Sequence, residues 1–544
     1  MRYYRRGVTA LLCCLQLFSL SRVCNVPERC QSRALIQGMS SSGKQFRAFP
    51  PRVVCAALVR RKIAPHLITR ELNTMAVTLN TSIHWTSASA DDLLMLENLQ
   101  PNILKEHTRD CSTLLFLKFA QPDEGKAFLR SLVPHLKSTI DHLQEIRAFK
   151  STKVPGTPYV GVGLTATGYA ALAIDNVPSD AAFQHGMQGN ADLHDPDVAT
   201  WDVPFRNPAQ LHGVIIIGDS KLAPMSKKLA QIQALITAHP GVTVLGSQDG
   251  RALHNSNGDG IEHFGYVDGR SQPLFFDEDI TAQRLLTDGA QVWNPAFALQ
   301  QAIVSDPAAP EPDKHFGSYF IFRKLEQNVK RFKEHELTFA NTLGLDDKER
   351  AGAMLLGRFE DGTPVTAQFA DGNHNPVPNN FNYGSDAEGS KCPFLGHIRK
   401  TNPRGSGGFG QSEEAERAHL MPRRGLTYGL RTDNPNDGNI QNKPEKDVGL
   451  LFMAFNSNIG NQFEFTQVSW ANNPKFPEVV AGPFPGVDPV IGQLPKGTPR
   501  ATVHCPVEWG NPDTVKTVAS VPQAVTMKGG AYFFMPSLAF FHAL

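Results

Sequence analysis

The fold is constrained most by short apolar runs that alternate with helical patterns and then start again in mid-chain. "STLLFLKFA" (112–120) has apolar side chains at successive positions, as in a buried strand, and the segment after it has helical periodicity. "GSYFIFRKLEQNVKRFKEHELTFA" (317–340) repeats the passage from strand to amphipathic helix. Two such runs predict an α+β protein built from two similar units with antiparallel sheets.

Further elements fill each run in the same order. In the first, "PYVGVGLTATGYAALAI" predicts a strand and a short helix, and a buried strand (211–220) precedes a helix (224–239). In the second, "DKERAGAMLLGRF" is helical and "GLLFMAFNSN" (449–458) predicts a strand. We therefore expect an N-terminal domain over 75–290 and a C-terminal domain over 291–544.

Residues 1–74 differ in composition from the rest of the chain. They hold 13 Lys and Arg but only two acids, whereas the remainder holds 40 Lys and Arg against 50 Asp and Glu. An acidic body argues against nucleic acid as a partner, because phosphate binding needs clustered positive charge. Five of the eight cysteines also lie before residue 75, and no CxxC exists, which argues against a zinc ribbon or a disulfide framework.

The N-terminal segment itself has three interpretations. "MRYYRRGVTALLCCLQLFSLSRVC" has a basic start and an apolar stretch of about 14 residues, as in a secretory signal. The Arg-rich, acid-poor composition up to residue 70 is typical of an organelle transit peptide. Alternatively, 1–74 is a mis-assigned start and Met75 begins a cytoplasmic protein. No later run of 18 apolar residues exists, so we expect no transmembrane segment in the body.

Three short segments carry residues suited to chemistry: "EHFGYVDGRSQP" (262–273), "CPFLGHIRKTNPR" (392–404) and "HLMPRRGLTYGL" (419–430). Taken singly, each has an ordinary explanation. Asp268 before a glycine suits a tight turn, His397 suits a structural role, and an Arg pair before glycine suits a solvated turn.

Several enzyme classes are disfavoured by the motifs that are missing. No GxSxG of a serine hydrolase follows a strand. "GSGGFG" lacks the lysine and the strand–helix context of a phosphate-binding loop. There is no HExxH and no close His/Cys cluster of a zinc enzyme.

In combination and in this order, the three segments resemble those of the dye-decolorizing peroxidases, in particular the longer members of that family. "GSYFIFRKLEQNV", "GRFEDGTPV" and "GLLFMAFNSNIGNQFEF" extend the resemblance over roughly residues 95–475. It implies two ferredoxin-like domains with antiparallel sheets flanked by helices, and one heme b per chain held mainly by the C-terminal domain. The implied activity is reduction of hydrogen peroxide through an oxoferryl intermediate and oxidation of organic donors such as dyes and phenolic compounds.

The resemblance also assigns the principal site residues. His397 would be the proximal iron ligand, Asp268 the distal acid–base group and Arg423 the distal cation. A carboxylate can move the peroxide proton, and a guanidinium stabilises developing negative charge. The residues alone do not distinguish Arg423 from Arg424, and the family's pattern selects the first.

Other positions are implied as cofactor contacts. Gly269 would let the backbone approach the macrocycle closely. The polar and neighbouring positions that would touch the heme or its propionates are Arg270, Ser271, Arg399, Asn402, Pro403 and Arg404. Glu464 is the candidate partner for the second ring nitrogen of His397. The other interpretation of Glu464 is an exposed strand residue.

Two questions stay open from the sequence. An electron from a bulky donor would travel through a surface tyrosine or one of the tryptophans Trp85, Trp201, Trp293, Trp470 and Trp509, although core packing is the better explanation of each. An oligomer is also left open.

The alternative function is a heme-binding or heme-handling protein of the same fold with incidental peroxidase activity. The presence of both Asp268 and Arg423 favours the enzyme, because a carrier needs no proton shuttle.

Overall fold

The computed structural model describes residues 77–544, apart from 108, 287–290, 436 and 480–483. Residues 73–544 form one compact unit. The predictions for residues 1–74 and for Met75 as the true start lie outside the described residues. None of the described helices combines the length and apolar character that crossing a bilayer requires.

The first half of the described chain forms four antiparallel strands, β1 (Cys111–Phe119), β2 (Tyr159–Leu164), β3 (Gly213–Asp219) and β4 (Val242–Arg251). Their order in the sheet is β4-β1-β3-β2. Every residue of β3 is buried. This explains why the sequence "GVIIIGD" shows no alternation between apolar and polar positions.

The second half repeats this arrangement with β8 (Phe316–Gln327), β9 (Leu426–Tyr428), β10 (Gly449–Asn456) and β13 (Val525–Met535). Their order is β13-β8-β10-β9, and the pairs are antiparallel. Counted within each half, both sheets therefore run fourth, first, third, second. That order, with helical crossovers, is the ferredoxin-like arrangement, and the predicted α+β class with antiparallel sheets is confirmed.

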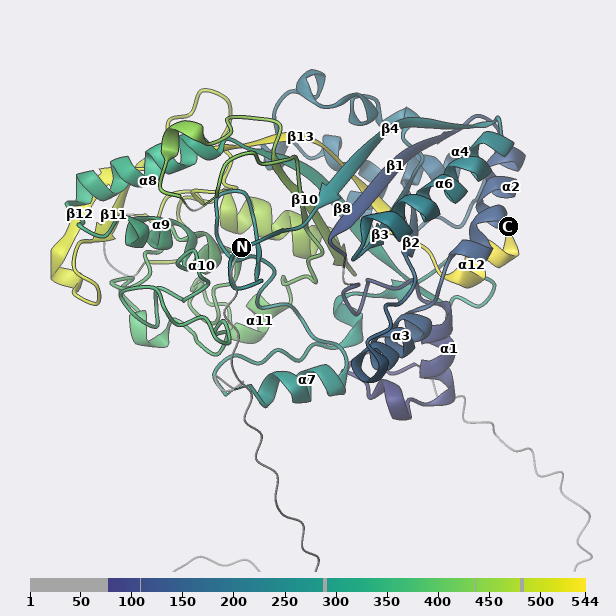
Figure 1. The fold of residues 1–544 in the computed structure, drawn as a ribbon, viewed down its shortest axis with the longest axis horizontal. Helices are drawn as coiled ribbons and strands as arrows, with labels where there is room; N and C mark the ends of the chain where they lie inside the picture. The colour runs from purple at the N-terminus through teal and green to yellow at the C-terminus, as the bar shows by residue number, and fades with distance from the viewer. Residues whose placement is uncertain (1–76, 108, 287–290, 436, 480–483) are drawn as a thin grey trace, which may run out of the picture. The chain divides into compact units, whose positions relative to one another are not determined.

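The two halves share one sheet. Phe534 of β13 pairs with Leu164 of β2, which joins them edge to edge. The outer strands β4 and β9 also contact each other, since Thr427 donates a hydrogen bond to the carbonyl of Arg251. The sheet is thus strongly curved, and its strands run through the centre of the ribbon in Figure 1.

Helices cover the sheet and carry the loops around it. The main apolar core lies on β1, β3, β8 and β13, and a second, smaller core lies beneath α8 and α9. The described α-helices are α1 (Ala90–Asn98), α2 (Pro122–Leu132), α3 (Thr139–Thr152), α4 (Ala166–Ala171), α5 (Ala181–His185), α6 (Leu222–Ala238), α7 (Asp277–Arg284), α8 (Val329–Leu343), α9 (Lys348–Leu356), α10 (His397–Thr401), α11 (Glu413–Arg417) and α12 (Leu538–Ala543). The short strands are β5 (Leu253–His254), β6 (Gly260–Ile261), β7 (Val304–Ser305), β11 (Thr502–Pro506) and β12 (Val515–Ala519).

Two segments differ from the simplest sequence interpretation. The helical pattern after β1 is broken near Pro134, and α3 starts again with a capping box in which Ser138 and Asp141 bond each other's backbone N–H. The segment after β10 is not a strand. It forms π-helical turns over Gly460–Glu464 and Thr466–Ala471, so Glu464 is a helical residue.

Candidate active site

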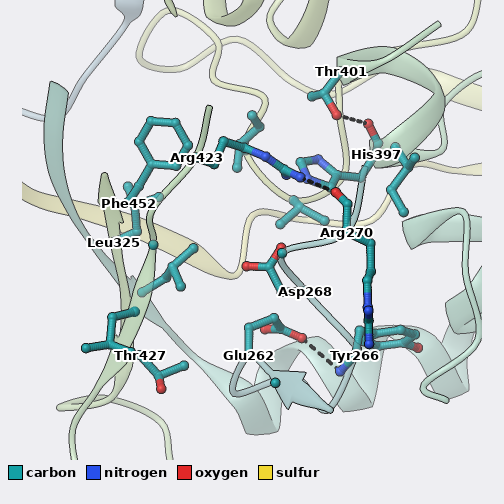
Figure 2. Close-up of a pocket in the computed structure, with 18 of the residues that line it drawn as sticks. Glu262, Tyr266, Asp268, Arg270, Leu325, His397, Thr401, Arg423, Thr427 and Phe452 are labelled. Atoms are coloured by element: carbon teal, nitrogen blue, oxygen red, sulfur yellow. Dashed lines mark hydrogen bonds between the residues drawn. The ribbon is translucent and has the colours of Figure 1, made fainter. Parts of the chain in front are cut away.

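A cavity of about 700 Å³ brings the three sequence motifs together. Asp268, His397 and Arg423 all line it, and the side chains of Leu325 and Phe452 supply apolar wall from β8 and β10. Figure 2 shows the carboxylate of Asp268 and the guanidinium of Arg423 directed toward the same space. Segments that lie more than 100 residues apart in the sequence therefore form one site.

Asp268 is presented by a tight turn, as its sequence predicted. Ile261 and Val267 form an antiparallel bridge, and the Asp268 N–H donates to the carbonyl of Gly260 at 3.0 Å. Gly269 follows with φ of 77°, a left-handed conformation that favours glycine. A Cβ built on Gly269 would meet no atom within 4 Å, so this glycine borders open space inside the site.

Arg423 is fixed by its backbone and by its side chain. It bridges Ala454 of β10, and its N–H donates to the side-chain oxygen of Gln272 at 2.9 Å. Its guanidinium donates to the carbonyl of Arg270 at 2.7 Å. Arg424 points elsewhere, because its guanidinium donates to the carbonyls of Asn102 and Ile103. The first arginine of the pair is thus the one that lines the cavity.

His397 is the first residue of α10, and a carboxylate holds its ring. Nδ1 lies 2.8 Å from Oδ2 of Asp488, whose side chain is fully buried. The other carboxylate oxygen accepts the backbone N–H groups of Val490 and Ile491. Burial favours neutral forms of both side chains, but their mutual attraction outweighs it, so the pKa of His397 is raised and that of Asp488 is lowered. The remaining nitrogen, Nε2, has no hydrogen bond within the described residues.

The expectation that Glu464 would orient His397 is wrong. Glu464 accepts a hydrogen bond from the hydroxyl of Tyr532 at 2.9 Å, because the π-helical turn directs it toward β13. Asp488 takes the expected place at His397. Asp488 lies 91 residues beyond the histidine, and in the sequence it looks like an aspartate that caps a turn. No sequence spacing therefore linked it to His397.

Arg399 is not a cavity residue either. Its side chain is fully buried and donates to Asp386, with N–O distances of 3.0 Å to the carboxylate and 2.9 Å to the carbonyl. It also lies over the rings of Phe394 and Tyr383. The suitability of arginine for carboxylate recognition suggested a propionate contact, but Arg399 packs into the protein against Asp386.

The remaining predicted contacts divide into two groups. Gly269, Arg270, Ser271 and Asn402 line the cavity, whereas Pro403 and Arg404 do not. Arg404 reaches the cavity only indirectly, by donating to the hydroxyl of Ser271 at 2.8 Å.

Sequence reasoning missed Glu106, Asp110 and Glu262, which also line the cavity. Glu262 accepts the backbone N–H groups of Phe264 and Tyr266 at 2.8 and 3.1 Å, which stabilises the turn before Asp268 (Figure 2). Burial raises the pKa of Glu262 to about 7, and the charge of Asp268 adds to that effect. Glu262 stands in the first motif, but nothing in the sequence around it indicated a place in the site.

The residues present fit a heme. The cavity has apolar walls, the His397 ring with its uncommitted Nε2, and a surplus of positive charge at its edge. Burial, together with the nearby charges of Arg404, Arg270 and Arg423, lowers the pKa of Arg358 to about 9. The hydrogen bonds of Arg358 within the described chain go to carbonyl and amide oxygens, not to carboxylates. Such a cluster suits an anionic group such as a propionate.

Comparison with known proteins identifies the family of this chain. A family profile described as the DyP dimeric alpha+beta barrel domain matches residues 98–252. The multifunctional dye peroxidase DyP2 of Amycolatopsis sp. is 55% identical over 474 residues, which cover 86% of this chain and 100% of the relative. Its solved structure superimposes with a TM-score of 0.83.

More distant relatives share the fold over similar lengths. The structure of a DyP-type peroxidase from Anabaena sp. has a TM-score of 0.77 at 35% identity, and the match covers 85% of this chain and 96% of that one. The dye-decolorizing peroxidase msp1 of Mycetinis scorodonius is 28% identical, with 83% and 88% of the two chains covered. Because it is 55% identical to DyP2 over 474 residues, the chain belongs to the dye-decolorizing peroxidase family.

Proposed function

We propose that this protein is a heme peroxidase that reduces hydrogen peroxide and oxidises organic donors such as dyes and phenolic compounds. The observation that carries the proposal is the placement of Asp268, Arg423 and His397 around one cavity. The relatives named above are dye peroxidases, and peroxidases of this family are heme enzymes.

His397 is the residue that would hold the iron, through Nε2, in one heme b per chain. Asp488 accepts the Nδ1 proton and so makes the ring a more basic ligand. Arg270, Ser271 and Asn402 line the cavity where a propionate edge would lie, and Arg358 adds positive charge there. When bound, heme supplies the iron that exchanges electrons with peroxide and with the donor.

During peroxide reduction, Asp268 and Arg423 would handle the proton and the charge. Asp268 would take a proton from one oxygen of peroxide and give it to the other oxygen, which leaves as water. Arg423 stabilises the negative charge that develops while that oxygen leaves. Its bond to the Arg270 carbonyl fixes the guanidinium beside the turn that carries Asp268.

The test is peroxide reactivity of heme-loaded Asp268→Asn. Proton transfer by a positioned carboxylate contributes about 10²- to 10⁴-fold, so we expect the stopped-flow rate of the peroxide-dependent spectral change to fall by that factor. Asp249→Asn is the matched control, because Asp249 is exposed on β4 and does not line the cavity. No Soret band in the wild type with heme would reject the cofactor. An unchanged rate in Asp268→Asn would instead support a heme-handling protein.

A further inference from the structure

Lys400 lies one turn beyond His397 on α10 and is completely buried. Its ammonium donates to the backbone carbonyls of Asn473 and Gly486, at 3.0 and 2.8 Å, and to that of Phe476. No ion pair includes Lys400 among the residues that the structure describes. All three donors of this ammonium are thus used, and all by main-chain oxygens.

A buried ammonium is held in place by its hydrogen bonds, because losing any one of them leaves charge without solvation. Three carbonyls from separate positions converge on Lys400, so its side chain joins all three to α10. The side chain therefore fixes where those carbonyls lie relative to α10.

One of these carbonyls, that of Gly486, belongs to the backbone directly before Asp488. Gly486 is two residues before Asp488, and the Asp488 N–H donates to the carbonyl of Ala471 at 2.9 Å. α10 consequently contacts this segment twice, through the His397–Asp488 hydrogen bond and through Lys400.

Other contacts of Asp488 do not make this connection. Its own turn is closed by the N–H groups of Val490 and Ile491, and Arg500 donates to its carbonyl at 3.2 Å. These bonds set the local shape of the turn. Lys400 instead joins the backbone at Gly486, just before the turn, to α10, the helix that carries His397.

We propose that Lys400 is a positioning residue for the His397–Asp488 pair: by clamping the backbone before Asp488 to α10, it holds the carboxylate against Nδ1 and keeps His397 a basic ligand. This role rests on the proposed function, in which His397 binds the heme iron.

The test compares Lys400→Met with Lys443→Met in the full chain. Lys443 is a matched control because it is also a buried ammonium, bonded to the carbonyl of Asn434 and to Asp437, and it does not line the cavity. Both variants lose stability. We expect only Lys400→Met to lower heme affinity, by about tenfold, since partners that orient a metal ligand typically contribute about 10- to 100-fold.

Two further readouts separate positioning from general destabilisation. Weakening the bond to Asp488 makes His397 less basic, so the iron–histidine stretching frequency falls and the reduction potential rises. In the double variant Lys400→Met/Asp488→Asn, both values should equal those of Asp488→Asn alone, because Lys400 acts through Asp488. Wild-type values in folded Lys400→Met would overturn the proposal.

If Lys400→Met does not fold, Lys400→Gln, which keeps two N–H donors, should give values between those of the wild type and Asp488→Asn. Wild-type values there would equally overturn the role. Crystal structures of the apoproteins address the clamp without heme: the His397–Asp488 distance should lengthen in the variant and not in Lys443→Met. An unchanged distance rejects the clamp, whereas a wild type that binds no heme rejects only the proposed function.

Discussion

The guanidinium of Arg423 donates a hydrogen bond to the main-chain carbonyl of Arg270, 2.7 Å away. Arg270 stands two residues after Asp268, in the same turn. The cation from the second half of the chain is therefore fastened to the segment that presents the carboxylate from the first half. Changes at either residue should disturb the placement of the other.

Replacing Arg423 with Leu should slow peroxide reduction by about 10²- to 10³-fold, the usual effect of removing one group that stabilises developing charge. Arg423→Lys keeps the charge but not the planar fork, so it should recover only part of the rate. Stopped-flow kinetics with peroxide gives both values. Arg147→Leu, an exposed change on α3, should react like the wild type, and a fast Arg423→Leu variant would exclude the assigned role.

Glu262 should make the free energy of unfolding of the apoprotein depend on pH. Its pKa is about 7 in the folded chain against an ordinary value of 4.5, so between these values the folded state binds more protons than the unfolded state. Stability should be greatest below the lower value and should fall as pH rises through the higher one. Urea unfolding at several pH values should show a smaller decline for Glu262→Gln. Glu334→Gln, an exposed change on α8, should retain the wild-type decline, and equal slopes in all three proteins would contradict the prediction.

Asp488→Asn should weaken heme binding by about 10- to 100-fold, because the amide is a poor acceptor for the His397 Nδ1 proton. Glu464→Gln should bind heme as the wild type does, since Glu464 bonds Tyr532. Spectroscopic titration of each apoprotein with heme measures the affinities. A weaker Glu464→Gln complex beside a normal Asp488→Asn complex would reverse the assignment.

Arg399→Met should reduce stability rather than change the spectrum of bound heme. It leaves the buried Asp386 carboxylate without its cation, and breaking such a pair costs about 3–5 kcal/mol. Denaturant unfolding measures the loss. If the variant kept wild-type stability but lost heme, a direct propionate contact would be restored as the explanation.

The sequence predicted what depends on contiguous residues. The turn at Asp268, the histidine segment around His397 and the arginine pair are each encoded within a few positions, and the family resemblance indicated that they meet. That His397 begins a helix was not predicted. The repeated order of strands was readable for the same reason, since each buried strand and amphipathic helix leaves its own pattern.

What the sequence did not reveal depends on tertiary contact. Asp488 meets His397 only because a distant segment folds back against α10, and no spacing rule links the two. Glu464 was misplaced because no sequence pattern shows which carboxylate meets His397. The alternative of a strand residue was also wrong, since the backbone there is helical. Arg399 was misplaced because a guanidinium pairs equally well with a buried Asp386 carboxylate as with a propionate, and the sequence does not say which one it meets.

The position of β13 has a consequence for the order of events during synthesis. This strand begins at Val525, pairs with β8 and joins β2, and Val525 and Met527 contribute to the cavity wall. A chain still attached to the ribosome before that point lacks a strand from the middle of its sheet and part of the wall around the site. Cofactor capture in its final form must therefore wait until translation has passed Met535, however early the strands of the first half assemble.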